Sequence, residues 1–117
     1  SALNVGRTLG VEGRHEEALV ILEESNETAA RVLDDGDELR AYFEVALGEC
    51  LANLGRYDEG APYLRAGVER AIEHLGPGNR YARWFAKIAA NVMAEHDPAA
   101  DDEVARYREI AAGTKDG

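Results

Sequence analysis

Apolar residues along this chain recur at spacings of three, four and seven, the pattern of helices that bury one face. The most regular stretch has its apolar positions at Phe43, Ala46, Leu47, Cys50, Leu51 and Leu54. No stretch alternates β-branched and polar residues as a strand would. The pattern predicts an all-α chain with helices over residues 2–12, 16–33, 38–54, 58–75, 80–95 and 101–112.

Residues that break or cap helices separate these stretches. The breaks fall at Gly13, Gly36, Gly55, Gly76-Pro77-Gly78 and Asp97-Pro98. Asp37 is placed to cap the third helix, and Pro62 is expected in the first turn of the fourth, where a missing N–H costs little. Because the connections are short, consecutive helices should pair, which favours an α-solenoid of three helix-turn-helix pairs.

The helix pairs repeat with a spacing of 42 residues, the distance from Gly13 to Gly55. At this spacing Gly6, Gly13, Arg14 and Glu17 recur as Gly48, Gly55, Arg56 and Glu59. Large residues also coincide, as Tyr42 does with Trp84. A fixed spacing of roughly 20 to 50 residues is typical of stacked repeats. We expect a single domain over 1–117, with units at about 1–36, 37–78 and 79–113 and a frayed tail over 113–117.

Several repeated residues stand where one family of helical repeats has its signature. In the second unit these are Leu47-Gly48, Gly55, Tyr57, Leu64 and Pro77. With these residues the chain resembles a tetratricopeptide repeat, and the 42-residue spacing resembles the longer repeat of kinesin light chain. The chain departs from the family at Gly60, where alanine is expected, at His15, where an aromatic is expected, and at Asp97-Pro98, where extra residues replace the turn glycine.

The resemblance implies a right-handed superhelix in which the first helices of the units line a concave, peptide-binding groove. Transferred by the repeat spacing, the residues expected to face a partner are Arg7, Tyr42, Glu49, Asn53, Trp84, Lys87 and Asn91. Lys87 and Asn91 lie four residues apart and could together hold a peptide carboxylate, although an ordinary solvated helix face has the same pattern. Tyr42 and Trp84 are either aromatic anchors for a partner or, as their helical spacing favours, part of the core between units.

Composition and charge narrow the classes of partner. With 117 residues, 45% of them hydrophobic, the chain fits one folded domain. The net charge of −10 repels nucleic acid and anionic lipid, so a protein or peptide partner is expected and a basic one is favoured. No apolar run approaches the roughly 20 residues of a membrane span. The single cysteine excludes an internal disulfide and fits a cytoplasmic address, and the excess of arginine over lysine favours a bacterial source.

No set of residues in the sequence points to catalysis. Cys50 falls on an apolar helix face, which favours a buried, inert thiol. His15, His74 and His96 belong to different units and are expected at the surface. The acidic residues around Gly36 lack the spacing of a calcium-binding loop. We therefore expect no enzymatic activity, no cofactor and no metal.

Together these observations predict a non-catalytic interaction module that binds a peptide or protein segment in its groove. We expect it to be part of a larger bacterial signalling or regulatory protein. The alternative hypothesis is a structural repeat segment that forms homo-oligomers through exposed end helices, because the ends of a stacked array present apolar faces.

Overall fold

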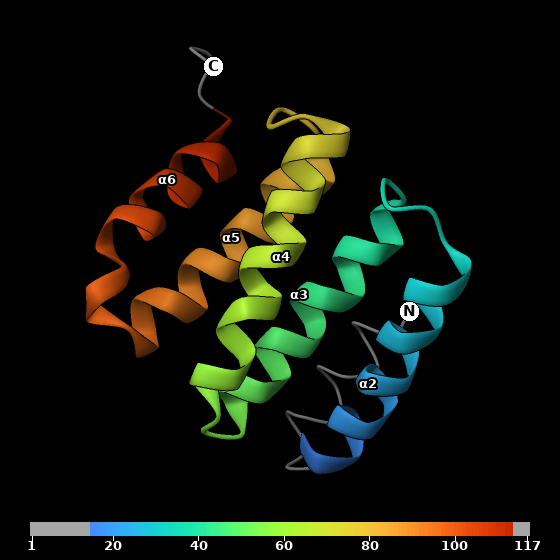
Figure 1. Ribbon diagram of the computed structural model, residues 1–117. Coiled ribbons are helices and arrows are strands. Elements are labelled where there is room, and N and C mark those ends of the chain that lie inside the picture. Colours follow the sequence, from blue (N-terminus) through green and yellow to red (C-terminus); the bar gives the residue numbers. More distant parts are fainter. Residues whose placement is uncertain (1–14, 114–117) are drawn as a thin grey trace.

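The computed structural model describes residues 15–113, and over this range the chain is all-α, with no strand. Its helices are α2 (His15–Val32), α3 (Glu38–Asn53), α4 (Tyr57–Leu75), α5 (Arg80–His96), the 3-10 helix η1 (Pro98–Ala100) and α6 (Asp101–Ala112) (Figure 1). The five α-helices begin and end within one residue of the predicted bounds. The predicted first helix, Arg7 and the tail beyond Gly113 lie outside the described residues.

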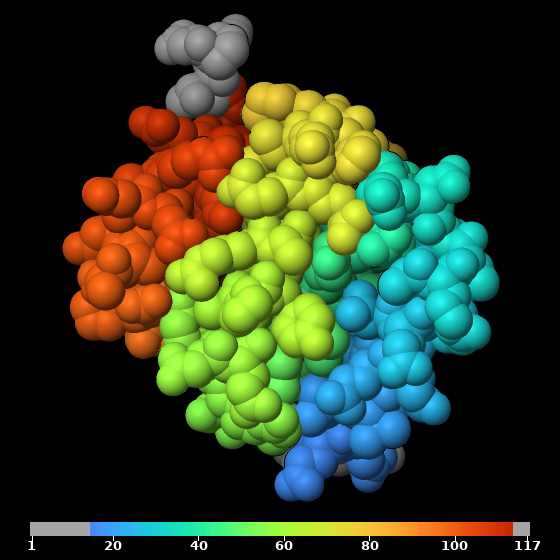
Figure 2. All heavy atoms as spheres, viewed as in Figure 1, coloured from blue at the N-terminus to red at the C-terminus, as the bar shows by residue number. Residues whose placement is uncertain are grey.

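The helices are arranged in two layers. In the view of Figures 1 and 2, α2, α4 and α6 form the front layer, and α3 and α5 lie behind them. Each helix packs on the next α-helix in the sequence, and α3 also packs on α5. Helices within the front layer stand further apart than helices that pack on each other: no Cα of α4 lies within 8 Å of a Cα of α2 or α6. The central helix, α3, is consequently buried on most of its sides.

Side-chain caps fix the starts of two helices. The Asp37 carboxylate accepts a hydrogen bond of 2.9 Å from the Leu39 N–H, which confirms Asp37 as the cap of α3. Asn79 caps α5 in the same way, since its Oδ1 accepts from the Tyr81 N–H at 2.8 Å. These caps satisfy backbone donors that have no partner inside the helix, and they explain why the predicted starts agree with the structure.

The turn between α3 and α4 depends on Gly55. Its φ of +78° lies in the left-handed region, where a side chain would be strained. Around it the Gly55 N–H bonds to the Ala52 carbonyl at 3.0 Å and the Arg56 N–H to the Leu51 carbonyl at 2.8 Å. This pair of bonds is the glycine-based helix end known as the Schellman motif. The predicted role of Gly55 as the turn glycine is confirmed.

Helices α3 and α4 cross with almost no side chain between them at Gly48 and Gly60. A Cβ atom on Gly48 would lie 2.8 Å from the Gly60 carbonyl oxygen and 2.9 Å from the Leu64 backbone nitrogen. A Cβ atom on Gly60 would lie 2.5 Å from the Gly48 carbonyl oxygen. Both positions therefore require glycine, and this explains why Gly60 departs from the alanine of the family pattern.

The turn between α5 and α6, inside the third predicted unit, is built differently. Asp97 stands at the repeat position of Gly55 but has a φ of −140°, and the chain continues through η1 instead of turning at once. As a result, the buried residues Val104 and Tyr107 of α6 correspond to the buried residues Ala61 and Leu64 of α4. The spacing between these corresponding residues is one residue longer than the 42-residue spacing of the first helices. The predicted insertion at Asp97-Pro98 is confirmed.

Two expectations are wrong in detail. Because α4 begins at Tyr57, Pro62 lies in its second turn, on the exposed side, where it leaves the Asp58 carbonyl without a helical N–H donor. His15 is half-buried, with a buried Nδ1 atom that has no hydrogen-bond partner among the described residues, so it is not a surface histidine. His74 and His96 are exposed, as predicted.

The crossing predicts that Gly48→Ala destabilises the protein. The added methyl meets backbone atoms of α4 that cannot rotate away, so we expect a net loss of about 1–3 kcal/mol, although alanine favours a helix by about 1 kcal/mol. Urea unfolding followed by helical circular dichroism measures the change. Gly78→Ala is the control, because nothing lies within 4 Å of a Cβ at Gly78. Equal stability of the two variants would contradict the proposed role of the crossing.

Candidate functional site

The two aromatic residues of the predicted groove differ in their surroundings. Tyr42 is buried, and its ring makes edge contacts with Trp84 at 5.8 Å and Phe85 at 6.1 Å between ring centroids. Trp84 stacks on Phe85 at 5.5 Å and remains 39% exposed. Tyr42 therefore belongs to the core between α3 and α5, whereas Trp84 also offers surface to a partner.

Lys87 and Asn91 lie on α5 one and two turns after Trp84, and both are exposed. With spacings of three and four residues, these three side chains share one side of the helix, which we call the α5 face. Within residues 15–113, neither Lys87 nor Asn91 forms a side-chain hydrogen bond or ion pair. The α5 face thus combines an aromatic surface, a cation and an amide that are all available to a ligand.

The other predicted groove residues within the described range offer less to a partner than the α5 face. Asn53 is exposed at the end of α3, while Glu49 is half-buried and already interacts within the chain. The structure therefore brings Trp84, Lys87 and Asn91 together on one helix and leaves Glu49 and Asn53 on its neighbour.

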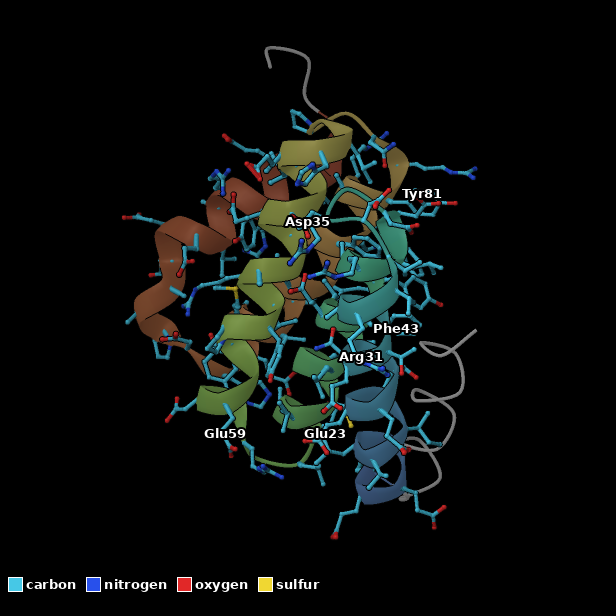
Figure 3. All side chains as sticks on the ribbon, turned by 45° about the vertical axis from the view of Figure 1, so that its right-hand side comes forward. Glu23, Arg31, Asp35, Phe43, Glu59 and Tyr81 are labelled. Carbon is cyan, nitrogen blue, oxygen red and sulfur yellow. The ribbon has the colours of Figure 1, made fainter. Side chains whose placement is uncertain are left out.

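A hollow between α2 and α4, in the opposite layer, was not predicted from the sequence. It has a volume of about 470 Å³, and its lining residues, which define the α2–α4 hollow, are Val20, Glu23, Glu24, Asn26, Glu27, Leu47 and Tyr63. Figure 2 shows the surface hollowed along the border between these two helices. Glu23 lies on the side of α2 toward α3 and α4 (Figure 3). The helical spacing from Val20 to Glu27 signals a common face of α2, but not the gap beside it.

The gap between α4 and α6 is bridged by charged side chains. The Arg65 guanidinium donates two hydrogen bonds to Glu103, of 2.8 and 3.0 Å. Glu69 pairs with Arg106 and also accepts a hydrogen bond of 3.0 Å from the Tyr107 hydroxyl. The hydrogen bond from Arg106 lowers the pKa of Glu69, and burial above all raises that of Tyr107. The front layer is therefore closed on this side of α4 by ion pairs.

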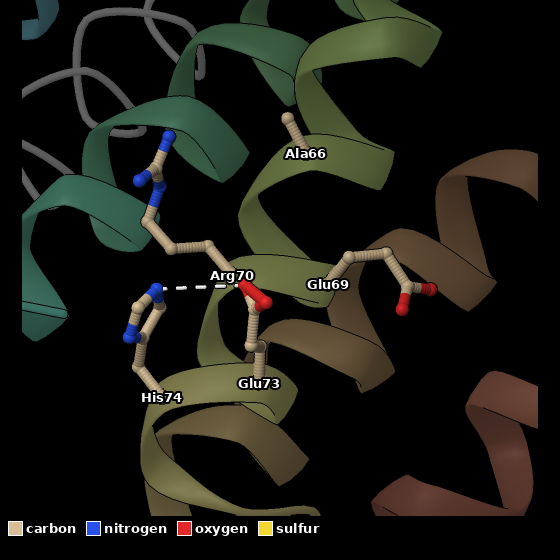
Figure 4. Close-up of a pocket in the computed structure, with 5 residues that line it drawn as sticks. All are labelled: Ala66, Glu69, Arg70, Glu73 and His74. Atoms are coloured by element: carbon tan, nitrogen blue, oxygen red, sulfur yellow. Dashed lines mark ion pairs between the residues drawn. The ribbon is translucent and has the colours of Figure 1, made fainter. Parts of the chain in front are cut away.

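A smaller hollow of about 380 Å³ lies on α4 itself, lined by Ala66, Glu69, Arg70, Glu73 and His74 (Figure 4). Its arginine is engaged in the structure. Arg70 donates to both oxygens of Glu44 on α3, at 2.8 and 3.2 Å, and to the Asp35 carbonyl at 3.2 Å. Because its charged groups also hold α4 to α3 and α6, this hollow is a weaker candidate for ligand binding than the α2–α4 hollow.

In the part of the chain that the structure describes, side chains capable of nucleophilic or metal chemistry are not brought together. Cys50 is buried, and its thiol donates to the His15 carbonyl oxygen at 3.5 Å. Burial first, and then the charges of Glu49 and Glu23, raise the pKa of Cys50, which suppresses the reactive thiolate. Within residues 15–113 no group of three potential ligands could hold a metal ion, and none of the described helices is long and apolar enough to cross a membrane.

The first residue of α4 also contacts the turn between α5 and α6. The Tyr57 hydroxyl donates a hydrogen bond of 3.1 Å to Asp97, and the Tyr57 ring stacks on His96 with centroids 5.5 Å apart. Burial, followed by the hydrogen bond to Asp97, raises the pKa of Tyr57 to about 12. The phenol therefore stays neutral near pH 7 and keeps the proton that it donates to Asp97.

Comparison of the chain with models of protein families, with curated proteins and with solved structures found no match.

The bridge between α4 and α6 predicts a pH-dependent contribution of Glu69 to stability. Its pKa is lower in the folded protein than the usual 4.5, so the carboxylate stabilises the fold above that pH and the contribution is lost as pH falls through the folded-state pKa. At pH 7 we expect Glu69→Gln to lose about 0.5 kcal/mol, a small value because the pair is half-exposed.

Urea unfolding of the wild type and Glu69→Gln at a series of pH values tests this expectation. The difference between the two proteins should shrink below about pH 4.5. Glu95→Gln removes an exposed carboxylate that has no ion pair with a described residue, and it serves as the control. If the stability difference between the wild type and Glu69→Gln stays constant with pH, the charge of Glu69 does not contribute to stability.

Proposed function

We propose that this chain is a non-catalytic protein–protein interaction module built from helical hairpins of the tetratricopeptide type, stacked as a right-handed superhelix. Three features of the fold support this proposal. Glycines mediate the close crossing and the tight turn of the second unit. Among the described helices, close backbone approaches are limited to sequence neighbours and to α3 with α5, which would be the first helices of successive units. Such nearest-neighbour packing is the defining property of a repeat array.

The observation that carries the proposed binding function is the α5 face. Trp84 is held in place by Tyr42 and Phe85, so a partner can pack on it without ordering a flexible side chain. Lys87 and Asn91 stand beside it and can donate to a peptide carboxylate. We propose that a peptide or protein segment binds here, with one apolar side chain on Trp84 and a carboxylate at Lys87 and Asn91.

The net charge of −10 adds a condition on the partner. The rest of the segment should be neutral or basic, because a strongly acidic one would be repelled by the molecule as a whole.

Selection of a random peptide display library on the immobilised protein tests this function. Enriched peptides are then retested on Trp84→Ala and Lys87→Glu variants. We expect both variants to weaken binding by about tenfold or more, because each removes a central contact. The readout is the dissociation constant of each synthesised peptide.

Arg108→Glu is the matched control. It makes the same change of charge as Lys87→Glu, and Arg108 is exposed on α6, not on the helix that carries the α5 face. Peptides that lose affinity equally for both charge variants would be responding to the overall charge. Peptides that bind the Trp84→Ala and Lys87→Glu variants as well as the wild type would overturn the assignment of the α5 face.

Self-assembly is a second candidate, favoured by one observation. Helix α2 exposes Val20 at 55%, Ile21 at 36% and Val32 at 67%. If the chain self-associates through this helix, light scattering should show a dimer. The substitution Val32→Glu should convert this dimer to a monomer, and Val32 lies outside the α2–α4 hollow. A wild type that stays monomeric up to about 1 mM would exclude self-assembly, since specific interfaces have dissociation constants below that concentration.

A further inference from the structure

The α2–α4 hollow is an unbridged gap between two helices of the front layer. On the other side of α4, where no Cα of α6 lies within 8 Å either, the gap is closed by the pairs of Arg65 with Glu103 and of Glu69 with Arg106. No described side chain forms a hydrogen bond or an ion pair with the lining residues Glu23, Glu24 or Glu27. The same layer thus has one border joined by ion pairs and one without them among the described residues, where the charge of Glu23 acts on Arg56 without an ion pair.

The inner part of the hollow is apolar. Leu47 of α3 lies at its base and is 2% exposed, while Val20 and Tyr63 form opposite walls and are 55% and 37% exposed. Apolar surface exposed inside a concave site is typical of a place where a partner's side chain packs. A volume of about 470 Å³ accommodates one large side chain together with the adjoining backbone.

The rim of the hollow is acidic. Glu23, Glu24 and Glu27 fall within two turns of α2, so their charges repel one another and no lining residue is basic. Their field also reaches inward, because the charge of Glu23 contributes to the raised pKa of Cys50. A cationic segment placed over the rim would relieve this repulsion and gain charge complementarity.

We propose that the α2–α4 hollow docks a short basic segment of a partner protein, in which one large apolar side chain is flanked by lysine or arginine residues. The apolar side chain packs against Val20, Leu47 and Tyr63, and the basic residues pair with the glutamates of the rim. This site lies in the opposite layer from the α5 face, and its existence does not depend on the function proposed for that face.

A labelled peptide of the sequence Lys-Arg-Phe-Lys-Arg, measured by fluorescence anisotropy, is the probe. We expect it to bind about fivefold or more tightly than the same peptide with alanine in place of phenylalanine. Glu24→Gln with Glu27→Gln, and separately Tyr63→Ala, should each weaken binding by about fivefold or more. Raising the salt from about 50 mM to about 500 mM should also weaken it, because the rim is solvent-exposed.

The control is Glu38→Gln with Glu95→Gln, which removes the same charge from exposed residues that have no ion pair with a described residue. It should leave the affinity within about twofold, since these residues lie outside the hollow. Circular dichroism of every variant checks that the helices are intact. When the probe peptide is added to the wild type, amide chemical shifts should change in α2 and α4.

Three results would overturn the proposal. One is an equal loss of affinity in the control, which would show diffuse attraction to an acidic protein. Another is equal binding of the phenylalanine and alanine peptides, and the third is no binding of the probe at millimolar concentration. Lys87→Glu and Trp84→Ala should leave the probe's affinity unchanged, so failure here and failure of the α5 face are distinguishable.

Discussion

The structure depends on the contact of two helix backbones at Gly48 and Gly60. Because no side chain separates them, α4 lies directly on α3, and this closeness brings Leu64 into the core and Arg70 within reach of Glu44. A second close approach at Gly67, whose Cβ would lie 2.6 Å from Val45, keeps the helices together further along. The position of α4 over α3 follows from these glycines.

Charged residues have two different roles in the front layer. The arginines of α4 that form ion pairs are directed to α6 and α3, where Arg65 meets Glu103 and Arg70 meets Glu44. None of them is among the residues of the α2–α4 hollow, whose α4 residue is Tyr63. Glu23, Glu24 and Glu27 of α2 therefore form no ion pair with a described residue across the gap, and they concentrate negative charge at the rim of the hollow.

The helices could be predicted from the sequence because their signals are local. Asp37 and Asn79 cap helix starts, Gly55 forms a turn, and apolar spacing marks the inner faces of the helices. The predicted helix bounds therefore agree with the observed ones to within one residue. The exposure of Tyr42 and Trp84 could not be predicted, although they occupy the same repeat position. Tyr42 is covered by α5, whereas within the described residues no further helix of the back layer follows to cover Trp84.

Features that join distant parts of the sequence also escaped prediction. The α2–α4 hollow arises from the distance between two helices that do not follow one another, and hydrophobic spacing within α2 contains no information about it. The contact of Tyr57 with Asp97 likewise joins two units, and neither residue signals it alone. Local periodicity thus determines the elements, while the spaces and contacts between units depend on the packing angles of whole helices.

The longer turn at η1 changes how this stack of helices could be extended or recombined. One added residue rotates a helix by about 100°, so a strict 42-residue template would place the charged residues Glu103 and Arg106 at the buried places of Ala61 and Leu64. The second hairpin therefore cannot replace the third by simple alignment of residue numbers. A designed chimera that adds units after α6 would have to take its phase from Val104 and Tyr107, which are the residues that face the core.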